Sequence, residues 1–316
     1  MSHADTVIAA VESARAARCS IAASWHRSFN RHGLDPAKRA AANVLSAPEL
    51  RARRGEAEQL IEIAASKLDR LHGLVGASGC AVVLTDAAGV ILDQRFADGD
   101  AAAFRGWGLI EGADWSEESE GTNGIGTCLV EGRSVIIHRD EHFFSKNVAM
   151  SCIDSPIFGA DGQLIGALDV SSARADQTGS NNLLLAAMVA QTARQIEADN
   201  FKAAFADARI VFAGREDADR NALVAINADD VIVGATRAAR QLYGWGMQGA
   251  FEPMAATDLF GRDEQLTGLA RGEKAAVVEA LTRAGGNASA AAKDLGIGRA
   301  TLYRRMKRLG IRRKPE

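Results

Sequence analysis

The stretch NASAAAKDLGIGRATLYRRMKRLGIRR, residues 287–313, decides how this chain is organised. Asn287 can cap a helix that runs to Leu295, and Gly296 ends that helix. A second helix follows Gly298, and its apolar residues recur at positions i, i+4 and i+7. These residues are Leu302, Met306 and Leu309. The spacing predicts a helix-turn-helix.

The outward side of the second expected helix is basic. Its cationic residues are Arg299, Arg304, Arg305, Lys307 and Arg308. A recognition helix must carry such groups toward base edges and phosphates. A solvated surface hairpin is the alternative, but turn glycines, apolar spacing and basic face all agree. We therefore interpret the stretch as a DNA-binding element.

With residues 273–286 as a leading helix, this region resembles the DNA-binding domain of the Fis family (factor for inversion stimulation). The motif is N-x-S-x-A-A-K-x-L-G-I-x-R-x-T-L-Y-R. The resemblance implies that Arg299 and Arg304 approach bases, and that phosphates are held by Asn287, Ser289 and Thr301. Gly298 stands where many relatives have Ser or Asn, so no base contact is expected there. The full set of expected DNA-binding residues is Asn287, Ser289, Arg299, Thr301, Tyr303, Arg304, Arg305, Arg308 and Arg312.

Charge is divided unevenly along the 316 residues. The net charge is −3, and residues 273–316 hold 11 Lys and Arg against 4 Asp and Glu, or +7, which leaves −10 for the rest. A small basic region joined to an acidic body suits a protein whose tail meets a polyanion. The length allows roughly two or three domains.

Cysteine use and hydropathy favour a cytoplasmic protein. The four cysteines are widely spaced, with no C-x-x-C pair and no secretory leader, so reduced thiols are expected. They are Cys19, Cys80, Cys128 and Cys152. No apolar run approaches the length of about 18 residues that would indicate a membrane span.

Residues 1–46 are expected to be helical, with an apolar stripe at Ile21, Trp25 and Phe29 that should dock on another element. The segment 24–28 (SWHRS), followed by HGLDP at 32–36, resembles the N-terminal S-W-x-R-S…G-L-x-P segment of acetoin-catabolism-regulator (AcoR-type) transcription factors. An amphipathic packing helix would look the same, and both interpretations can hold.

A sheet with flanking helices is expected from residue 47 to 203. A helix from Pro48 to about residue 76 carries the stripe Leu60, Ala64, Leu68, Leu71 and Val75. Strands are expected at 80–86, 90–95, 134–138, 155–158 and 163–171, and a helix at 181–205. That last helix is either a dimer seam or a packing helix. The pattern indicates an antiparallel α+β domain.

The glycines of EGTNGIGT, residues 120–127, form neither a phosphate loop nor a dinucleotide fingerprint. Together with EHFF at 141–144, SPIF at 155–158, Asp161-Gly162 and GALD at 166–169, they resemble the GAF sensory domain of the same AcoR-type regulators. The expected fold class is therefore α+β: N-terminal helices (1–46), a GAF domain (47–203), a truncated PAS-like segment (207–246), a linker (247–272) and an all-α Fis-type helix-turn-helix (273–316).

In the full AcoR-type architecture, an AAA+ ATPase that acts on sigma-54 polymerase lies between the sensor and the helix-turn-helix. Only the PAS-like segment and linker stand there in this chain, and no Walker lysine is present. ATP hydrolysis is not expected. The expected protein is a homodimeric, non-enzymatic DNA-binding regulator whose partners are double-stranded DNA and a small-molecule effector, with RNA polymerase as a further candidate. DNA binding requires no cofactor in this interpretation.

The sensor pocket is expected under a roof formed by residues 104–144, where aromatic residues supply walls and polar residues orient a ligand. The candidate ligand-binding residues are Trp107, Trp115, Asn123, Ile125, His138, His142, Phe143, Phe144 and Asp154. Core packing is the alternative for each aromatic residue among them.

Three alternatives remain open. His138-x-Asp140-x-His142 with Cys152 offers donors suited to iron or zinc, which would make the protein a metal-dependent redox or nitric oxide sensor. A cysteine-dependent methionine sulfoxide reductase of GAF fold would use Cys80, Cys128 or Cys152. An architectural DNA-bending protein would explain the basic tail but not the sensor.

Overall fold

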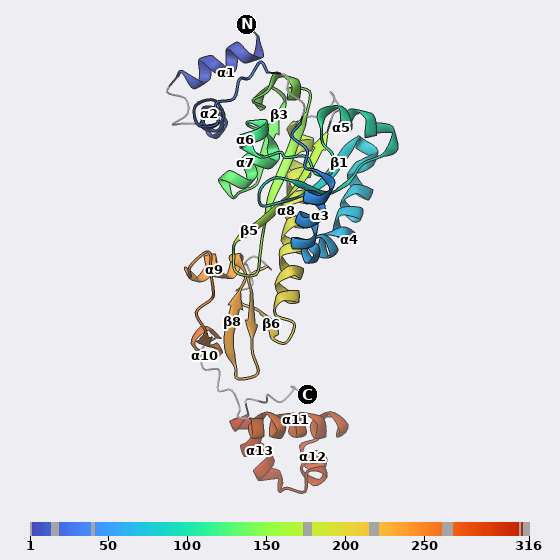
Figure 1. Ribbon diagram of the computed structural model, residues 1–316. Coiled ribbons are helices and arrows are strands. Elements are labelled where there is room, and N and C mark those ends of the chain that lie inside the picture. Colours follow the sequence, from blue (N-terminus) through green and yellow to red (C-terminus); the bar gives the residue numbers. More distant parts are fainter. Residues whose placement is uncertain are drawn as a thin grey trace. The chain divides into compact units, whose positions relative to one another are not determined.

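The computed structural model describes residues 2–13, 19–38, 42–172, 179–214, 221–260, 268–309 and 311. The chain forms two compact units, Met1–Met254 and Ala255–Glu316 (Figure 1). Among the described residues, no helix combines the length and the apolar character that crossing a membrane requires.

A five-stranded antiparallel sheet organises the first unit, as the α+β expectation required. Its strands are β1 (Cys80–Asp86), β2 (Ile91–Arg95), β3 (Val135–His138), β4 (Ser151–Phe158) and β5 (Leu164–Ser172), in the order β2-β1-β5-β4-β3. The long β4–β5 hairpin forms its centre, and the β1–β2 hairpin lies beside it.

Two long helices cover one face of this sheet (Figure 1). They are α4 (Glu58–Val75) and α8 (Gly179–Ala204). The buried residues of α4 are the stripe expected from sequence: Leu60, Ala64, Leu68, Leu71 and Val75. The single helix expected from Pro48 is instead two, because α3 (Ala47–Glu56) ends at Ala57 before α4 begins. On α8, Val189, Ala193 and Ile196 belong to the same core, so this side of α8 packs within the domain.

Shorter elements cover the opposite face. They are α5 (Ala101–Trp107), α6 (Glu117–Glu120) and α7 (Gly124–Glu131). Under them, Phe104, Trp115 and Ile125 pack on Ala81 and Val83 of β1. A second apolar core therefore lies between the sheet and the roof that was expected to hold the sensor pocket.

Strand β4 begins at Ser151, four residues before its expected start at Ser155. Its polar opening, with Cys152 and Asp154, lacks the alternating apolar pattern by which strands are found. Backbone pairing to both β3 and β5 nevertheless forms there. Two residues of the candidate site thus lie in a central strand rather than in a loop.

The N-terminal arm, residues 2–38 without the undescribed 14–18, packs against this roof. It contains α1 (His3–Val11), α2 (Ser20–His26) and the π-helical turn η2 (Arg27–Arg31). The expected stripe does dock: Ile21 packs beside β3, and Trp25 and Phe29 pack against Phe143.

A second module follows α8 and forms a four-stranded sheet in the order β6-β7-β8-β9. Its elements are β6 (Arg209–Phe212), β7 (Leu223–Ile226), β8 (Val231–Ala235), α9 (Arg237–Tyr243) and β9 (Met254–Ala255). All of these elements except β9 lie in the segment expected to be PAS-like, 207–246. Strand β9 and α10 (Ala256–Phe260) occupy part of the stretch expected to be a linker.

The β4–β5 turn lies directly against this module. A Cβ built on Gly162, whose φ is +76°, would stand 2.2 Å from the Met247 carbonyl oxygen. Gly234 of β8 meets the Phe205 ring just after α8 in the same way. The close approach at both glycines fixes the module to the end of the five-stranded sheet.

Besides α10, the described part of the second unit contains α11 (Gly268–Arg283), α12 (Ala288–Asp294) and α13 (Arg299–Arg308). Helix α11 begins at Gly268, five residues before its expected start. The apolar residues buried between the helices are Val277, Ala280, Ala291, Ala292, Leu302, Met306 and Leu309. Small alanines on α12 allow the close helix crossing that a helix-turn-helix needs.

Candidate functional site

Helix α13 presents one apolar and one basic side. Leu302 and Met306 are buried against α11 and α12. At about 100° per residue, Arg304 lies nearly opposite these side chains. Arg299, Arg304 and Lys307 are exposed. This helix can therefore approach DNA while its other side holds the domain together.

Local contacts orient two of the expected base-contacting residues. The Arg299 guanidinium lies 5.6 Å from the Tyr303 ring centroid, and its Nη2 is 3.4 Å from the Tyr303 hydroxyl oxygen. Arg304 Nη2 lies 3.5 Å from Thr301 Oγ1, at the limit of a hydrogen bond. Both arginines are exposed on α13.

Arg305 differs from its neighbours because it turns toward α11. Its Nη1 forms an ion pair with Glu273 Oε1 at 3.2 Å. Its position on α13 lies beside the buried stripe, with 41% of the side chain exposed, and the expected DNA contact of Arg305 stays a prediction. The Arg308 side chain and all of Arg312 lie outside the described residues.

Asn287 has the capping role that was expected from sequence. Its Oδ1 accepts hydrogen bonds from the Ser289 amide at 3.0 Å and the Ala290 amide at 3.2 Å. Ser289 is exposed at the start of α12. A phosphate contact from Asn287 would thus have to use its Nδ2 or its backbone, while Ser289 presents its hydroxyl to solvent.

Within the first unit, several candidate ligand residues pack in the core or cap a helix. Trp115 and Ile125 are 1% and 2% exposed in the apolar core, and Trp107 is partly buried against Phe104. Asn123 caps α7 by accepting from the Gly126 amide, and its Nδ2 donates to the carbonyl oxygens of Trp115 and Gly121. Their side chains take part in packing and capping, and the ligand contacts expected from them stay predictions.

Phe143 and Phe144 pack under the N-terminal arm. They are buried with Val7 and Val11 of α1 and contact Trp25 of α2. The sequence pattern could not assign these rings to the arm, because the contact joins segments more than a hundred residues apart.

A buried polar network fastens the arm to the roof. Arg27 Nε and Nη2 donate to the Glu117 carboxylate at 2.8 and 2.9 Å, and Glu117 is 2% exposed. The Ser24 hydroxyl donates to the same carboxylate and lies 2.7 Å from Thr122 Oγ1. The hydrogen bond to Glu117 raises the pKa of Arg27. The S-W-H-R-S segment thus binds the E-x-x-E-G-T-N-G roof, a contact that sequence reasoning missed.

His138 and His142 do not converge. His138 Nδ1 lies 2.9 Å from Ser151 Oγ, whereas His142 Nδ1 lies 2.9 Å from the Arg139 carbonyl oxygen. Asp140, between them, is exposed. Across the ranges that the structure describes, no group of three or more His, Cys, Asp or Glu side chains is placed to hold a metal ion. The geometry expected for a metal-dependent sensor is therefore not formed there.

His142 instead meets Cys152. The ring Nε2 lies 3.4 Å from Cys152 Sγ, and Ser171 Oγ lies 3.1 Å from the same sulfur. Burial lowers the pKa of His142 to about 4 and raises the pKa of the Cys152 and Cys128 thiols. Neutral thiols are poor nucleophiles, which disfavours a cysteine-dependent reductase.

Asp154 faces a second buried carboxyl group, Asp169, which sequence reasoning did not select. The two are direct partners across β4 and β5, and both are 0% exposed. Burial and the neighbouring Asp169 raise the pKa of Asp154, and burial raises the pKa of Asp169 to about 7. One signal in the sequence could have predicted this pair. Each of two adjacent apolar strands has an acidic residue at an inward position.

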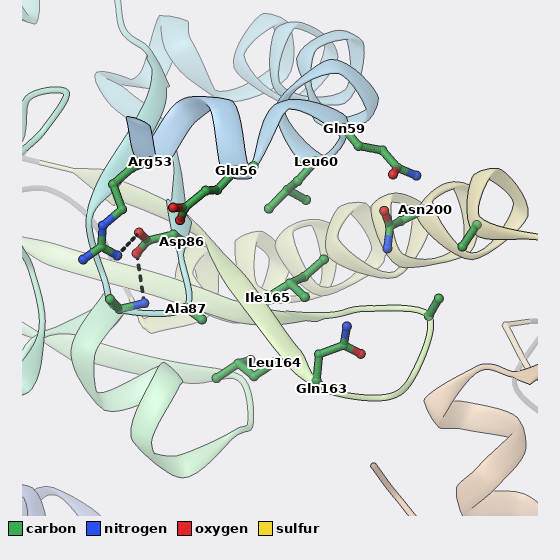
Figure 2. A pocket seen from close by; sticks show the side chains of 14 residues that line it. Arg53, Glu56, Gln59, Leu60, Asp86, Ala87, Gln163, Leu164, Ile165 and Asn200 are labelled. Carbon is green, nitrogen blue, oxygen red and sulfur yellow. Dashed lines mark hydrogen bonds and ion pairs between the residues drawn. The ribbon is translucent and has the colours of Figure 1, made fainter. Parts of the chain in front are cut away.

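An open groove of about 750 Å³ lies at the other end of the sheet, between the α3–α4 break, the β1–β2 turn, the β4–β5 turn and the end of α8. Figure 2 shows Arg53, Glu56 and Asp86 on the left of the groove and the apolar side chains of Leu60 and Ile165 to their right. Asp86 is already paired with Arg53 at 2.7 Å, and its Oδ1 accepts from two backbone amides of the turn. The charges of this groove are largely satisfied without a ligand.

Two family models match the chain. The "GAF domain" model matches residues 59–196, and the model described as "Bacterial regulatory protein, Fis family" matches residues 269–309.

The curated relatives are regulators of much greater length. The chain is 35% identical over 178 residues to the acetoin catabolism regulatory protein of Cupriavidus necator, covering 56% of this chain and 27% of that protein. It is 31% identical over 157 residues to the acetoin dehydrogenase operon transcriptional activator AcoR of Bacillus subtilis, covering 49% and 25%. The chain thus spans about a quarter of the length of these relatives.

Among solved structures, the Escherichia coli DhaR(N)–DhaL complex contains a chain of similar fold. The TM-score is 0.53 at 14% identity, with 76% of this chain and 80% of that chain covered. The likeness extends beyond the residues that the GAF model matches, and it concerns the fold alone.

Proposed function

We propose that this chain, which contains a GAF domain and a Fis-type helix-turn-helix domain, is a transcription regulator that binds double-stranded DNA and responds to a small molecule. The observation that carries the proposal is α13. Its apolar side is buried in the domain core, and its opposite side exposes Arg299, Arg304 and Lys307. The relatives named as regulators support the same function.

The recognition helix α13 enters the major groove in this proposal. Arg299 and Arg304 read base edges, and Ser289 and Thr301 bind phosphates near the helix starts. Because phosphate contacts supply much of the affinity, binding weakens steeply as salt rises.

Fluorescence anisotropy on a DNA site obtained by selection tests this placement. Arg299→Ala should reduce the preference for that site over random DNA by about 1–3 kcal/mol. Arg283→Ala removes an equal charge from α11, where the side chain pairs with Asp294, and serves as the matched control. Equal loss in both variants would contradict the assignment of α13.

The proposed regulator is a homodimer, because helix-turn-helix proteins gain specificity from two recognition helices one DNA turn apart. Each chain supplies one such element. Leu183 and Leu184 of α8 are 69% and 66% exposed, which supports a seam on the outer side of that helix. Light scattering of Leu183→Glu/Leu184→Glu should show a monomer, and an unchanged dimer would exclude this seam.

Regulation is proposed to proceed without ATP hydrolysis. Between the two matched domains lie the end of α8 and the β6–β9 module, and the sequence there contains no Walker motif. A ligand-dependent change in dimer geometry would act directly on DNA binding, with RNA polymerase or a competing full-length relative as the further partner. ATP turnover by the pure protein would contradict this part of the proposal.

The effector is proposed to bind on the α7 side of the five-stranded sheet. What supports this location is its buried polar groups, namely His142 with Cys152 and the Asp154–Asp169 pair. His138 and Ser151 lie on the other face of the sheet, beside Asn182 of α8. Because the N-terminal arm covers the roof, ligand entry requires the arm to move. Native mass spectrometry of protein purified without chelators would detect a bound organic molecule, and a stoichiometric metal would instead overturn the organic-effector proposal.

A further inference from the structure

The Asp154–Asp169 pair is enclosed on every described side. Gly124, at the start of α7, lies so close that a Cβ there would stand 1.9 Å from Asp154 Oδ2 and 2.5 Å from the Cys152 Cβ. In register, Asp169 lies opposite Val83 of β1, and Asp154 opposite Val135 of β3. Any residue larger than glycine at position 124 would push α7 off the sheet, so this position keeps the pair dry.

Titratable groups surround the pair, but none of those described forms an ion pair with it. Cys152 of β4 and Cys128 of α7 are its titratable neighbours, His142 contacts Cys152, and the charge of Arg133 acts on Cys128. Both Asp154 oxygens and Asp169 Oδ2 lack a hydrogen-bond donor among the described residues. Two facing carboxylates without a cation cannot both ionise in a dry core, so at least one of them keeps its proton.

A chain of hydrogen bonds leads away from the pair. Ser171 Oγ lies 3.0 Å from Asp169 Oδ1 and 3.1 Å from Cys152 Sγ. The His142 Nδ1–H donates to the Arg139 carbonyl, which leaves Nε2 to accept the Cys152 S–H. The carbonyl oxygen of His142 in turn accepts from His3 Nε2 of the arm at 2.9 Å.

The Ser171 hydroxyl has a single proton, so it can donate to only one of its two neighbours, Asp169 or Cys152, at a time. When Asp169 is ionised, the Ser171 hydroxyl donates to its carboxylate. When Asp169 holds the proton, Asp169 donates to Ser171, and the Ser171 hydroxyl can donate to Cys152 Sγ. The protonation state of Asp169 therefore determines which way the serine hydroxyl points.

We propose that Asp154 and Asp169 form a proton-operated switch in the GAF core. Asp154 keeps its proton, and loss of the Asp169 proton turns the Ser171 hydroxyl toward Asp169. That loss also places one negative charge in the dry core between β4 and β5, which weakens their packing. The turn of that hairpin lies against Met247 of the second module, so loosening the hairpin alters this contact. The proposal rests on the proposed sensor function only for its effect on DNA binding.

Carbon-13 NMR of the full chain, labelled at the aspartate Cγ, tests the switch directly. Across about pH 4 to 9, one carboxyl of the pair should titrate near pH 7, and Asp169→Asn should abolish that step. Ser171→Ala should move the step upward, because the hydroxyl stabilises the ionised form. Titration of both carboxyls near pH 4, or a step that persists in Asp169→Asn, would overturn the proposal.

Amide hydrogen exchange supplies the structural readout. Protection of β4 and β5, relative to β1 and β2 in the same sample, should fall as pH rises through the step in the wild type and stay constant in Asp169→Asn. Constant relative protection in the wild type would overturn the loosening of the hairpin.

DNA affinity separates this inference from the proposed function. A pH-dependent affinity that Asp169→Asn makes constant supports both. If the carboxyl titrates and the hairpin loosens while affinity is the same at every pH, the switch stands and its link to DNA binding is contradicted. Failure of Arg299→Ala to alter DNA preference bears on the proposed function alone.

Discussion

The helix-turn-helix unit and the GAF core place their polar side chains in opposite environments. On α13, arginines stand in solvent and the apolar residues hold the fold. In the GAF core, Glu117 is buried against Arg27, whereas Asp154 and Asp169 are buried without a cation among the described residues. An exposed cation can be replaced with little effect on folding, whereas a buried acid couples folding to its partner and to pH.

The comparison would be sharpened most by a core substitution in the smaller unit. Leu302→Ala should destabilise the helix-turn-helix by about 3–5 kcal/mol, because Leu302 is 0% exposed among α11 and α12. Calorimetry should show the transition of the GAF unit unchanged, since the chain forms two compact units. A single shifted transition for both units would contradict their independence.

The next largest effect is a pH dependence of GAF stability. The pKa of Asp169, about 7 in the fold, exceeds the value of about 3.9 in an unfolded chain. The contribution of protonated Asp169 to the free energy of unfolding is therefore complete below about pH 4, declines up to about pH 7 and is absent above that pH. This contribution is at most about 4 kcal/mol.

His142 opposes this trend. Its pKa is lowered to about 4, so the unfolded state gains a proton first as pH falls below about 6.5, and stability rises with pH between these values. Urea titrations of Asp169→Asn should show stability rising with pH between about 4 and 6.5, because of His142. In the wild type, the falling contribution of Asp169 partly cancels this rise. Parallel pH profiles for the two proteins would contradict the raised pKa of Asp169.

A smaller effect is expected at the buried ion pair of the arm. Arg27→Ala leaves Glu117 without its guanidinium at 2% exposure, and should cost about 2–3 kcal/mol, because Ser24 still donates to that carboxylate. Arg53→Ala breaks a pair of similar length whose arginine is 41% exposed, and should cost about 0–1 kcal/mol. Equal losses in chemical denaturation would remove the distinction between the two environments.

The smallest effects separate capping from DNA contact. Asn287→Ala should destabilise the helix-turn-helix by about 1 kcal/mol, because its side chain caps α12. Ser289→Ala should leave stability within about 0.5 kcal/mol and weaken DNA binding. The reverse pattern, in paired melting and anisotropy experiments, would exchange the roles of the two residues.

Periodicity predicted the parts of the fold that bury one continuous side. The α4 stripe and the α13 stripe are buried as expected, because a helix with one apolar side has one way to pack. Strands β6 and β9 were missed, since short strands show little alternation. The early start of β4 was missed because its inward residues include Cys152 and Asp154.

The candidate sites show the same difference between features of a single element and contacts between distant segments. Exposure of Arg299 and Arg304 follows from their position on one helix, whereas the ion pair of Arg305 depends on Glu273 of another. The Arg27–Glu117 and Asp154–Asp169 contacts depend on the docking of distant segments and on strand register. Neither can be obtained from spacing along the chain. The division into an N-terminal segment, a sensor, a PAS-like segment and a linker stays a prediction.

Selection of bound sequences from a random DNA pool tests the central claim most directly, namely that α13 reads DNA in a symmetric dimer. The wild-type chain should enrich two inverted half-sites with centres about 10 base pairs apart, and Arg299→Ala should lose the preference at one position of each half-site. Enrichment of no motif by the wild type, or of an identical motif by Arg299→Ala, would contradict the claim.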